Sequence, residues 1–312
     1  PGIAKSASAR VIAKNQNIPE DRYMDVNLVN HEVVDFNGIP RINDSGSAPV
    51  TEFIPTDIFA KFRNGTGPGF INIEELPQSE RSHQTWTAGF IWDRKTATFD
   101  LDPQVRIMCT GNRVQDRSGA KALLAHLNNR VYHYDIEVDT EAALVWMLDN
   151  GVDPMVVAFL RLRRDLVQKF DPDVRASPTC RAWTQFGTEV PRDLPRDLYL
   201  MTAIGKLGEG AAVELVAALD MMHKMPNIDE IRARPADVEV PTEPSVRYAV
   251  ATCMSMSTTP DLFAADMQYI SRMPAEFQMV YVTDATRLNP DLQDSPDYIK
   301  WAVANQNTFM GA

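Results

Sequence analysis

The 312-residue sequence is poor in several features that would reveal its class at once. It has only three cysteines, Cys109, Cys180 and Cys253, which are odd in number and widely spaced. This usage argues against a disulfide framework and favours reduced thiols in a cytosolic compartment. Its five histidines lack the spacing of a metal-binding motif, which argues against a transition-metal site.

Long apolar runs and an excess of basic charge are lacking too. No apolar run approaches the roughly 20 residues that a membrane-spanning helix needs, and the first residues do not resemble a secretory signal. The net charge of −11 argues against general affinity for nucleic acid, although several subunits could still form a local basic pore. The composition is 44% hydrophobic and 23% charged, which is typical of a globular protein with a sizeable core. With the cysteine usage, this leads us to expect a cytoplasmic protein.

Apolar patterning divides the chain into two parts. Up to about residue 138, short β-rich runs alternate with helical stretches, which is typical of an α/β domain with a mostly parallel sheet. Strands that are buried on both faces read as continuous apolar runs, as residues 105–110 nearly do. The expected strands are Met24–Leu28, Phe70–Ile73, Val105–Thr110 and Val131–Val138.

Residues 139–312 are predicted to be almost entirely helical. A helix over Thr140–Asn150 would end at Gly151. Asp153 and the proline after it supply a cap and a first-turn residue for the next helix, whose apolar face would run from Val156 to Phe170. Further helices are expected at 209–224, 243–256, 260–272 and 295–307.

The first residues of the sequence contain a pattern that binds phosphate in other proteins. The segment Pro1–Ser6 (PGIAKS) matches the last six positions of the loop G-x-x-x-x-G-K-[ST]. In such a loop, backbone amides face the phosphates, the lysine reaches the outer phosphates and the serine hydroxyl ligates Mg²⁺. An ordinary loop that leads into a helix has the same short string, so the match needs support from elsewhere in the chain.

Two expected strands end in polar residues that suit phosphate hydrolysis. The run that begins at Phe70 ends in two adjacent carboxylates. Glu74 would hold hydrated Mg²⁺, and Glu75 would orient the attacking water. The expected strand Val105–Thr110 runs into Gly111 and Asn112, and the Asn112 side chain would reach this water and the γ-phosphate. Each feature has an ordinary alternative, because acidic pairs occur in solvated loops and asparagine after glycine is normal in turns.

The order and spacing of these segments resemble MoxR-type AAA+ ATPases. Residues 107–119 (IMCTGNRVQDRSG) are similar to the stretch around the first sensor, and residues 124–130 (LAHLNNR) to the segment that ends in the arginine finger. Residues 177–183 (SPTCRAW) look like the start of the lid helix that carries the second sensor, and the similarity continues through 205–212 and 245–250. The resemblance implies an AAA+ P-loop domain over residues 1–138, followed over 139–312 by an all-helical lid and a helical C-terminal extension.

The resemblance also implies residue roles. Glu75 would be the catalytic carboxylate, Asn112 the first sensor and Arg181 the second sensor. Arg130 would reach the nucleotide of the neighbouring subunit and stabilise charge on its γ-phosphate. Judged without the motif, Arg130, like Arg113 and Arg117, could equally be an ordinary surface salt-bridge partner. Ser6 and Glu74 would ligate Mg²⁺. The nucleotide-binding residues would be Gly2, Ile3, Ala4, Lys5, Ser6 and Ala7.

Relatives of this type imply ATP hydrolysis in a ring, expected to contain six subunits. Hydrolysis would drive remodelling or maturation of a protein partner, sometimes through a partner with a von Willebrand factor A domain, and neither a membrane nor nucleic acid is an expected partner. An insertion after Leu28 and a β-hairpin near Lys95–Asp102 are implied as well. Because the strand that feeds a phosphate-binding loop is absent, we expect an upstream segment of some tens of residues.

Two alternatives remain open. Ala4 replaces the last glycine of the loop, and Glu74 replaces the usual aspartate. Both departures favour a nucleotide-gated assembly or scaffold protein that hydrolyses ATP weakly. A DNA-dependent motor is disfavoured by the acidic charge, but Arg94 and Lys95 near the expected hairpin keep it open.

Overall fold

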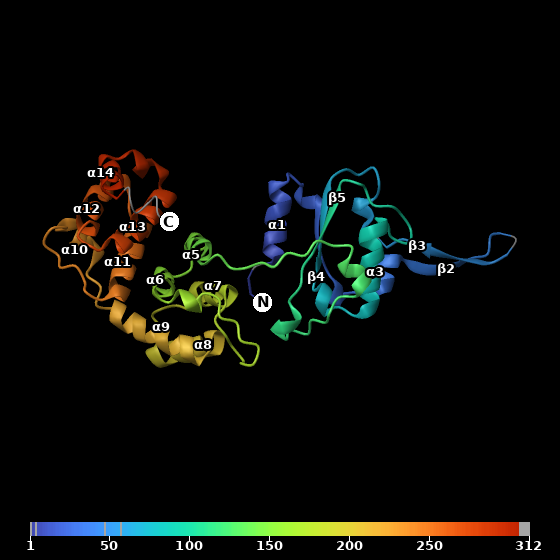
Figure 1. Ribbon diagram of the computed structural model, residues 1–312, viewed down its shortest axis with the longest axis horizontal. Helices are drawn as coiled ribbons and strands as arrows, with labels where there is room; N and C mark the ends of the chain where they lie inside the picture. The colour runs from blue at the N-terminus through green and yellow to red at the C-terminus, as the bar shows by residue number, and fades with distance from the viewer. Residues whose placement is uncertain (1, 4, 47, 57, 306–312) are drawn as a thin grey trace. The chain divides into compact units, whose positions relative to one another are not determined.

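The computed structural model describes residues 2–3, 5–46, 48–56 and 58–305 (Figure 1). The chain divides into two compact units, Pro1–Glu137 and Val138–Ala312. The first unit contains the strands, and the second is helical.

A parallel sheet of three strands forms the centre of the first unit. Its order is β1 (Tyr23–Asn27), β4 (Gly69–Glu74) and β5 (Val105–Cys109), with β4 in the middle. Tyr23 is paired with Phe70 and Ile71 with Ile107. The predicted α/β class with a parallel sheet is confirmed, as are three of the four predicted strands.

Helices cover both faces of this sheet (Figure 1). On one face, Ala9 and Ala13 of α1 (Lys5–Asn15) pack with Tyr23 and Phe70. On the other face, α3 (Arg81–Asp93) contributes to a larger apolar cluster that contains Ala88, Phe90, Ile71 and Ile73. Burial on both sides is the reason why β4 reads as a nearly continuous apolar run.

The fourth predicted strand, residues 131–138, is wrong. The segment follows α4 (Ala125–Asn128) as irregular chain, and Tyr132 and Tyr134 are 91% and 83% exposed. Its aromatic and β-branched residues have strand propensity, but a strand also needs a hydrogen-bonded neighbour. In the part of the chain that the structure describes, no strand is paired with this segment.

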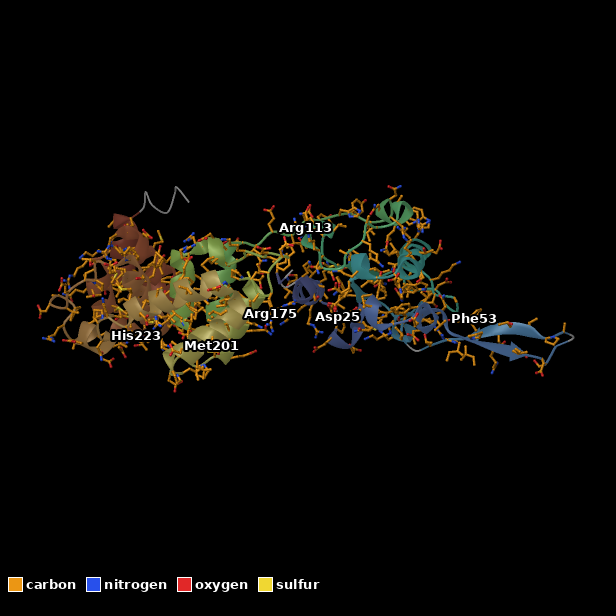
Figure 2. All side chains as sticks on the ribbon, turned by 90° about the horizontal axis from the view of Figure 1, so that it is seen from below. Asp25, Phe53, Arg113, Arg175, Met201 and His223 are labelled. Atoms are coloured by element: carbon orange, nitrogen blue, oxygen red, sulfur yellow. The ribbon has the colours of Figure 1, made fainter. Side chains whose placement is uncertain are left out.

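The implied insertion after Leu28 contains a short helix and an antiparallel ribbon. Helix α2 (Val33–Asn37) precedes β2 (Ile39–Asn43) and β3 (Val50–Ile54), which project from the first unit (Figures 1 and 2). Near Lys95–Asp102, a bridge between Lys95 and Asp100 closes a tight turn where a hairpin is expected. Short 3₁₀ turns elsewhere are Glu20–Arg22, Leu28–Asn30, Ala60–Phe62, Leu76–Gln78, Val114–Asp116, Arg164–Leu166 and Pro290–Asp294.

The second unit is built from helices around one apolar core. They are α5 (Thr140–Asp149), α6 (Pro154–Leu162), α7 (Cys180–Glu189), α8 (Arg196–Leu207), α9 (Glu209–Met222), α10 (Ile228–Ala233), α11 (Pro244–Met256), α12 (Pro260–Ile270), α13 (Ala275–Leu288) and α14 (Pro296–Ala304). Asp153 caps α6 by accepting a hydrogen bond from the Met155 N–H. Across the described ranges, no helix combines the length and apolar character that crossing a bilayer requires.

The predicted helix from Asp153 to Phe170 is too long. α6 ends at Leu162, and Arg163 has φ −119° and ψ 64°, which lie outside the helical region. A 3₁₀ turn follows, in which Leu166 is still 3% exposed. The apolar residues are therefore buried without a continuous helix. The predicted helix at 295–307 ends at Ala304, and residues 306 and 307 lie outside the described residues.

Candidate functional site

Helix α1 brings Lys5 to the loop that follows β5. The Lys5 Nζ donates a hydrogen bond to Oδ1 of Asn112 at 2.6 Å. Ser6 and Ala7, in the same helical turn, are exposed. A first helical turn carries N–H groups without intrahelical acceptors, so this end of α1 can face an anion.

The residues that precede α1 are only partly described. Gly2 and Ile3 are half-buried, and Gly2 has φ 74°, a left-handed value that suits glycine. Ala4, which replaces the expected loop glycine, lies outside the described residues. The structure therefore gives no account of that replacement.

The end of β4 makes a sharp turn at the paired carboxylates. Glu74 is the last residue of the strand, and Glu75 has φ 57° and ψ 32° in the left-handed region. A non-glycine residue there costs about 1–2 kcal/mol. The turn remains attached to the neighbouring strand end, because the Leu76 N–H donates to the Thr110 carbonyl at 3.1 Å. Glu75 is thus held in a strained turn beside the end of β5.

Gly111 lets the two turns approach each other. A Cβ atom at this position would lie 2.0 Å from Cδ of Pro77 and 3.2 Å from Oε1 of Gln78. Only glycine permits this contact between the turn after Glu75 and the residue before Asn112. Lys5, Glu75 and Asn112, which are far apart in sequence, therefore come from α1 and from two strand ends that are packed together.

A polar network lies on the α1 side of the sheet. Nδ2 of Asn72 donates to Oδ1 of Asp25 at 2.8 Å and to Oε1 of Glu74 at 3.3 Å. The Tyr23 hydroxyl donates to the same Asp25 oxygen at 2.5 Å. Burial, followed by this bond to Asp25, raises the pKa of Tyr23 above its ordinary value. Sequence reasoning missed Asn72 and Asp25, although polar residues inside two apolar strands were a usable signal.

The two arginines are placed differently. Arg130 is half-buried against α3, where Nη1 donates to the Ala88 carbonyl at 2.6 Å. Its guanidinium lies 5.5 Å from the ring centroid of Trp92, within the range of a cation–π contact. Arg181 is exposed in the first turn of α7, in the second unit.

The oxygen atoms at this edge suit a magnesium ion. Glu74 offers a carboxylate and Ser6 an exposed hydroxyl, and hard oxygen ligands are those that Mg²⁺ prefers. Mg²⁺ usually takes only one or two carboxylates from a protein and completes its shell with water and phosphate. The Lys5 ammonium group supplies the positive charge that a polyphosphate requires. The residues present therefore fit a magnesium nucleotide.

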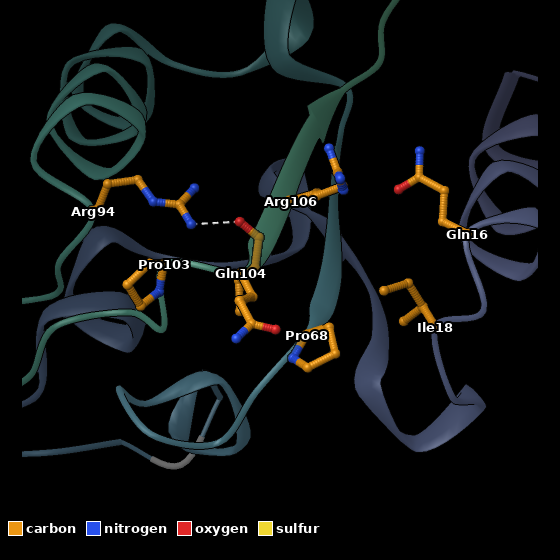
Figure 3. Close-up of a pocket in the computed structure, with 8 residues that line it drawn as sticks. Gln16, Ile18, Pro68, Arg94, Pro103, Gln104 and Arg106 are labelled. Atoms are coloured by element: carbon orange, nitrogen blue, oxygen red, sulfur yellow. Dashed lines mark hydrogen bonds between the residues drawn. The ribbon is translucent and has the colours of Figure 1, made fainter.

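A cavity of about 420 Å³ lies at the other edge of the sheet, near the amino ends of β4 and β5 (Figure 3). Its lining includes Arg94, which donates to the carbonyls of Asp102 and Val105. Ligands of parallel α/β sheets bind beyond the carboxyl ends of the strands. The chemistry of Lys5, Glu75 and Asn112 gathers at that carboxyl edge, so the cavity does not belong to the candidate site.

No protein-family model matches the sequence, and no curated protein matches it. Among solved structures, NtrX from Brucella abortus is similar at 12% identity with a TM-score of 0.37, over 91% of this chain and 62% of that chain. NtrX from Brucella abortus in complex with ADP is similar at 13% identity with a TM-score of 0.33, over 94% of this chain and 62% of that chain. The chain thus spans under two thirds of either structure.

Proposed function

We propose that the protein is an AAA+ ATPase of the MoxR type. The observation that carries the proposal is the hydrogen bond between Lys5 and Asn112, at 2.6 Å. It joins the start of α1 to the loop after β5, and Gly111 packs that loop on the turn that holds Glu75. A cation, a carboxylate and an amide at one sheet edge are the groups that phosphoryl transfer to water needs.

Each residue of the candidate site would act on ATP in a distinct way. The Lys5 ammonium group would bind outer phosphate oxygens, together with the N–H groups of the first turn of α1. Ser6 and Glu74 would hold Mg²⁺, which neutralises phosphate charge when it is bound. Glu75 would accept a hydrogen bond from the attacking water and orient it. The Asn112 amide would contact that water or the γ-phosphate.

Steady-state ATP hydrolysis tests this assignment. Glu75→Gln should lower the rate by at least about 100-fold, because general-base assistance is worth about 10²–10⁴-fold. Nucleotide binding should persist in the variant. The matched control is Glu80→Gln, since Glu80 is exposed and pairs with Lys121. Equal rates for the wild type and Glu75→Gln would contradict the role of Glu75.

We further propose that the protein acts as a ring, of six subunits, in which Arg130 completes the site of a neighbour. Here the Arg130 guanidinium contacts the Ala88 carbonyl and the Trp92 ring of α3, and in a ring it would instead contact the nucleotide of the adjacent subunit and stabilise charge on its γ-phosphate. In this scheme the first unit is the nucleotide-binding domain, and the second contains the lid, which carries Arg181, and the helical C-terminal extension. Hydrolysis would remodel a protein partner, directly or through a protein with a von Willebrand factor A domain.

Mixing inactive variants tests whether Arg130 acts between subunits. Arg130→Ala and Glu75→Gln should each be inactive alone, whereas mixed rings contain some interfaces with both native residues and should regain part of the activity. Arg81→Ala, at an exposed arginine on α3, is the matched control and should stay active. Mixtures as inactive as the separate variants would contradict action between subunits.

The alternatives predict different results. A nucleotide-gated scaffold, favoured by Ala4 in place of glycine and Glu74 in place of aspartate, would bind ATP but hydrolyse it only weakly. A DNA-dependent motor would be stimulated by DNA. The structure weakens the main support for the latter, because Arg94 donates to two backbone carbonyls within the first unit and so stabilises its own loop.

A further inference from the structure

The side-chain amide of Asn72 is fully buried in β4, between two buried isoleucines in the sequence and within hydrogen-bonding distance of Glu74. Asn72 is 0% exposed within β4. The Nδ2 atom of Asn72 carries two hydrogens. It donates one hydrogen bond to Oδ1 of Asp25 at 2.8 Å and another to Oε1 of Glu74 at 3.3 Å. The amide therefore bridges two carboxylates that carry the same charge.

The network extends from Glu74 to helix α1. Asp25 (labelled in Figure 2) is the register partner of Asn72, and its Oδ2 accepts a hydrogen bond from Arg10 of α1 at 3.2 Å. Tyr23 donates to the other Asp25 oxygen at 2.5 Å. Arg10, Asp25 and Asn72 thus connect the helix that begins at Lys5 with the carboxylate at the end of β4.

The chemistry of Asn72 is unfavourable for a residue that serves only the core. Its Oδ1 is buried and has no hydrogen-bond partner among the described residues. A buried polar atom without a partner lowers stability, whereas leucine has a similar size and carries no polar atom. The benefit of the amide therefore lies in what Nδ2 holds, which is the carboxylates of Asp25 and Glu74.

We propose that Asn72, supported by Asp25, positions Glu74 for the divalent cation of the bound nucleotide. A glutamate side chain is long and has several rotamers, and the bond to Asn72 selects those in which Oε1 faces the amide. Residues that orient a metal ligand in this way typically change metal affinity by about 10–100-fold when they are removed. This inference rests on the proposed function.

Nucleotide binding as a function of magnesium concentration tests the proposal. A fluorescent ATP analogue is titrated into the full chain in EDTA and at a series of free Mg²⁺ concentrations. Asn72→Leu should raise the Mg²⁺ concentration for half-maximal effect about tenfold. Its affinity in EDTA should remain that of the wild type, because Lys5 and α1 are unchanged. Asn64→Leu, at an exposed asparagine, is the control.

A second variant covers the case in which Asn72→Leu does not fold. Asp25→Asn keeps a similar shape and removes the charge behind the amide, so it should shift the Mg²⁺ requirement in the same direction. Unchanged Mg²⁺ dependence in a folded variant, or equal losses with and without Mg²⁺, would show that the network is only structural. If the wild type binds nucleotide but the variants keep its Mg²⁺ dependence, only this inference fails. If the wild type binds no nucleotide, the proposed function fails as well.

Discussion

Lys5 and Asn112 are 107 positions apart in sequence, yet the ammonium nitrogen of one lies 2.6 Å from the amide oxygen of the other. A hydrogen bond with a charged donor is stronger than one between neutral groups. This bond ties the first turn of α1 to the loop after β5, so the position of each side chain depends on the other.

Asn112 is also proposed to contact the attacking water or the γ-phosphate, so removing its amide should affect hydrolysis more than binding. We expect Asn112→Ala to lower the rate of ATP hydrolysis by about 100-fold, the usual effect of losing one preorganised hydrogen-bonding group at a reacting centre. Steady-state hydrolysis and equilibrium binding of an ATP analogue measure the two effects. Asn129→Ala, at an exposed position, is the control. Hydrolysis by Asn112→Ala at the wild-type rate would remove Asn112 from the site.

Gly111 should be intolerant of any side chain. The added methyl group of Gly111→Ala would lie 2.0 Å from Cδ of Pro77, so one of the two turns must move. We expect the free energy of unfolding to fall by about 1–3 kcal/mol. Gly89→Ala in α3 is the control, because its Cβ would meet only Asp93 Oδ2 at 3.9 Å and alanine favours a helix by up to about 1 kcal/mol. Urea denaturation measures both, and equal effects would count against the close packing of the turns.

Asp102 should make part of the stability depend on pH. Its carboxylate accepts hydrogen bonds from the N–H groups of Gln104, Gly67 and Gly65, at 2.9, 2.7 and 3.0 Å. The bond from Gln104, followed by that from Gly67, lowers the pKa of Asp102 below its ordinary value. A carboxylate with a lowered pKa stabilises the fold at pH values above its unfolded pKa of about 3.9, and this contribution is lost as the pH falls through the folded pKa.

Asp102→Asn should accordingly have a lower Tm than the wild type at pH 7. The difference should shrink as the pH falls below about 4, where the unfolded carboxyl group is protonated. Thermal unfolding from pH 3 to pH 7 measures this change, with Asp100→Asn at an exposed neighbouring position as the control. A difference that is constant across this range would mean that the charge of Asp102 does not stabilise the loop.

A buried ion pair in the second unit should be worth more than an exposed one. Arg161 and Asp284 are 2.5 Å apart, with side chains that are 5% and 2% exposed. Asp284→Asn leaves the arginine charge buried and should destabilise the unit by about 3–5 kcal/mol. Asp220→Asn breaks the exposed pair with Arg196, at 2.7 Å, and should cost only about 0–1 kcal/mol. Chemical denaturation of the two variants tests the contrast, and similar losses would refute it.

Local sequence patterns predicted many elements because their determinants are close together in the chain. The helix expected to end at Gly151 is α5, and the cap predicted at Asp153 accepts its hydrogen bond from Met155. The β4 run was recognisable because both of its faces are buried. The same patterns failed for residues 131–138, where strand propensity lacks a paired neighbour, and beyond Leu162, where a 3₁₀ turn buries the apolar residues.

The sequence alone determined which residue types stand at the helix start and at the two strand ends, and so the kind of chemistry they suit. It could not place them, because contacts between distant positions depend on strand order and register. The bond from Asn72 to Asp25 spans 47 positions and exists because β1 lies beside β4 in one particular register. Tertiary structure alone joined Lys5 to Asn112 and brought Gly111 against Pro77, since neither contact leaves a local pattern in the chain.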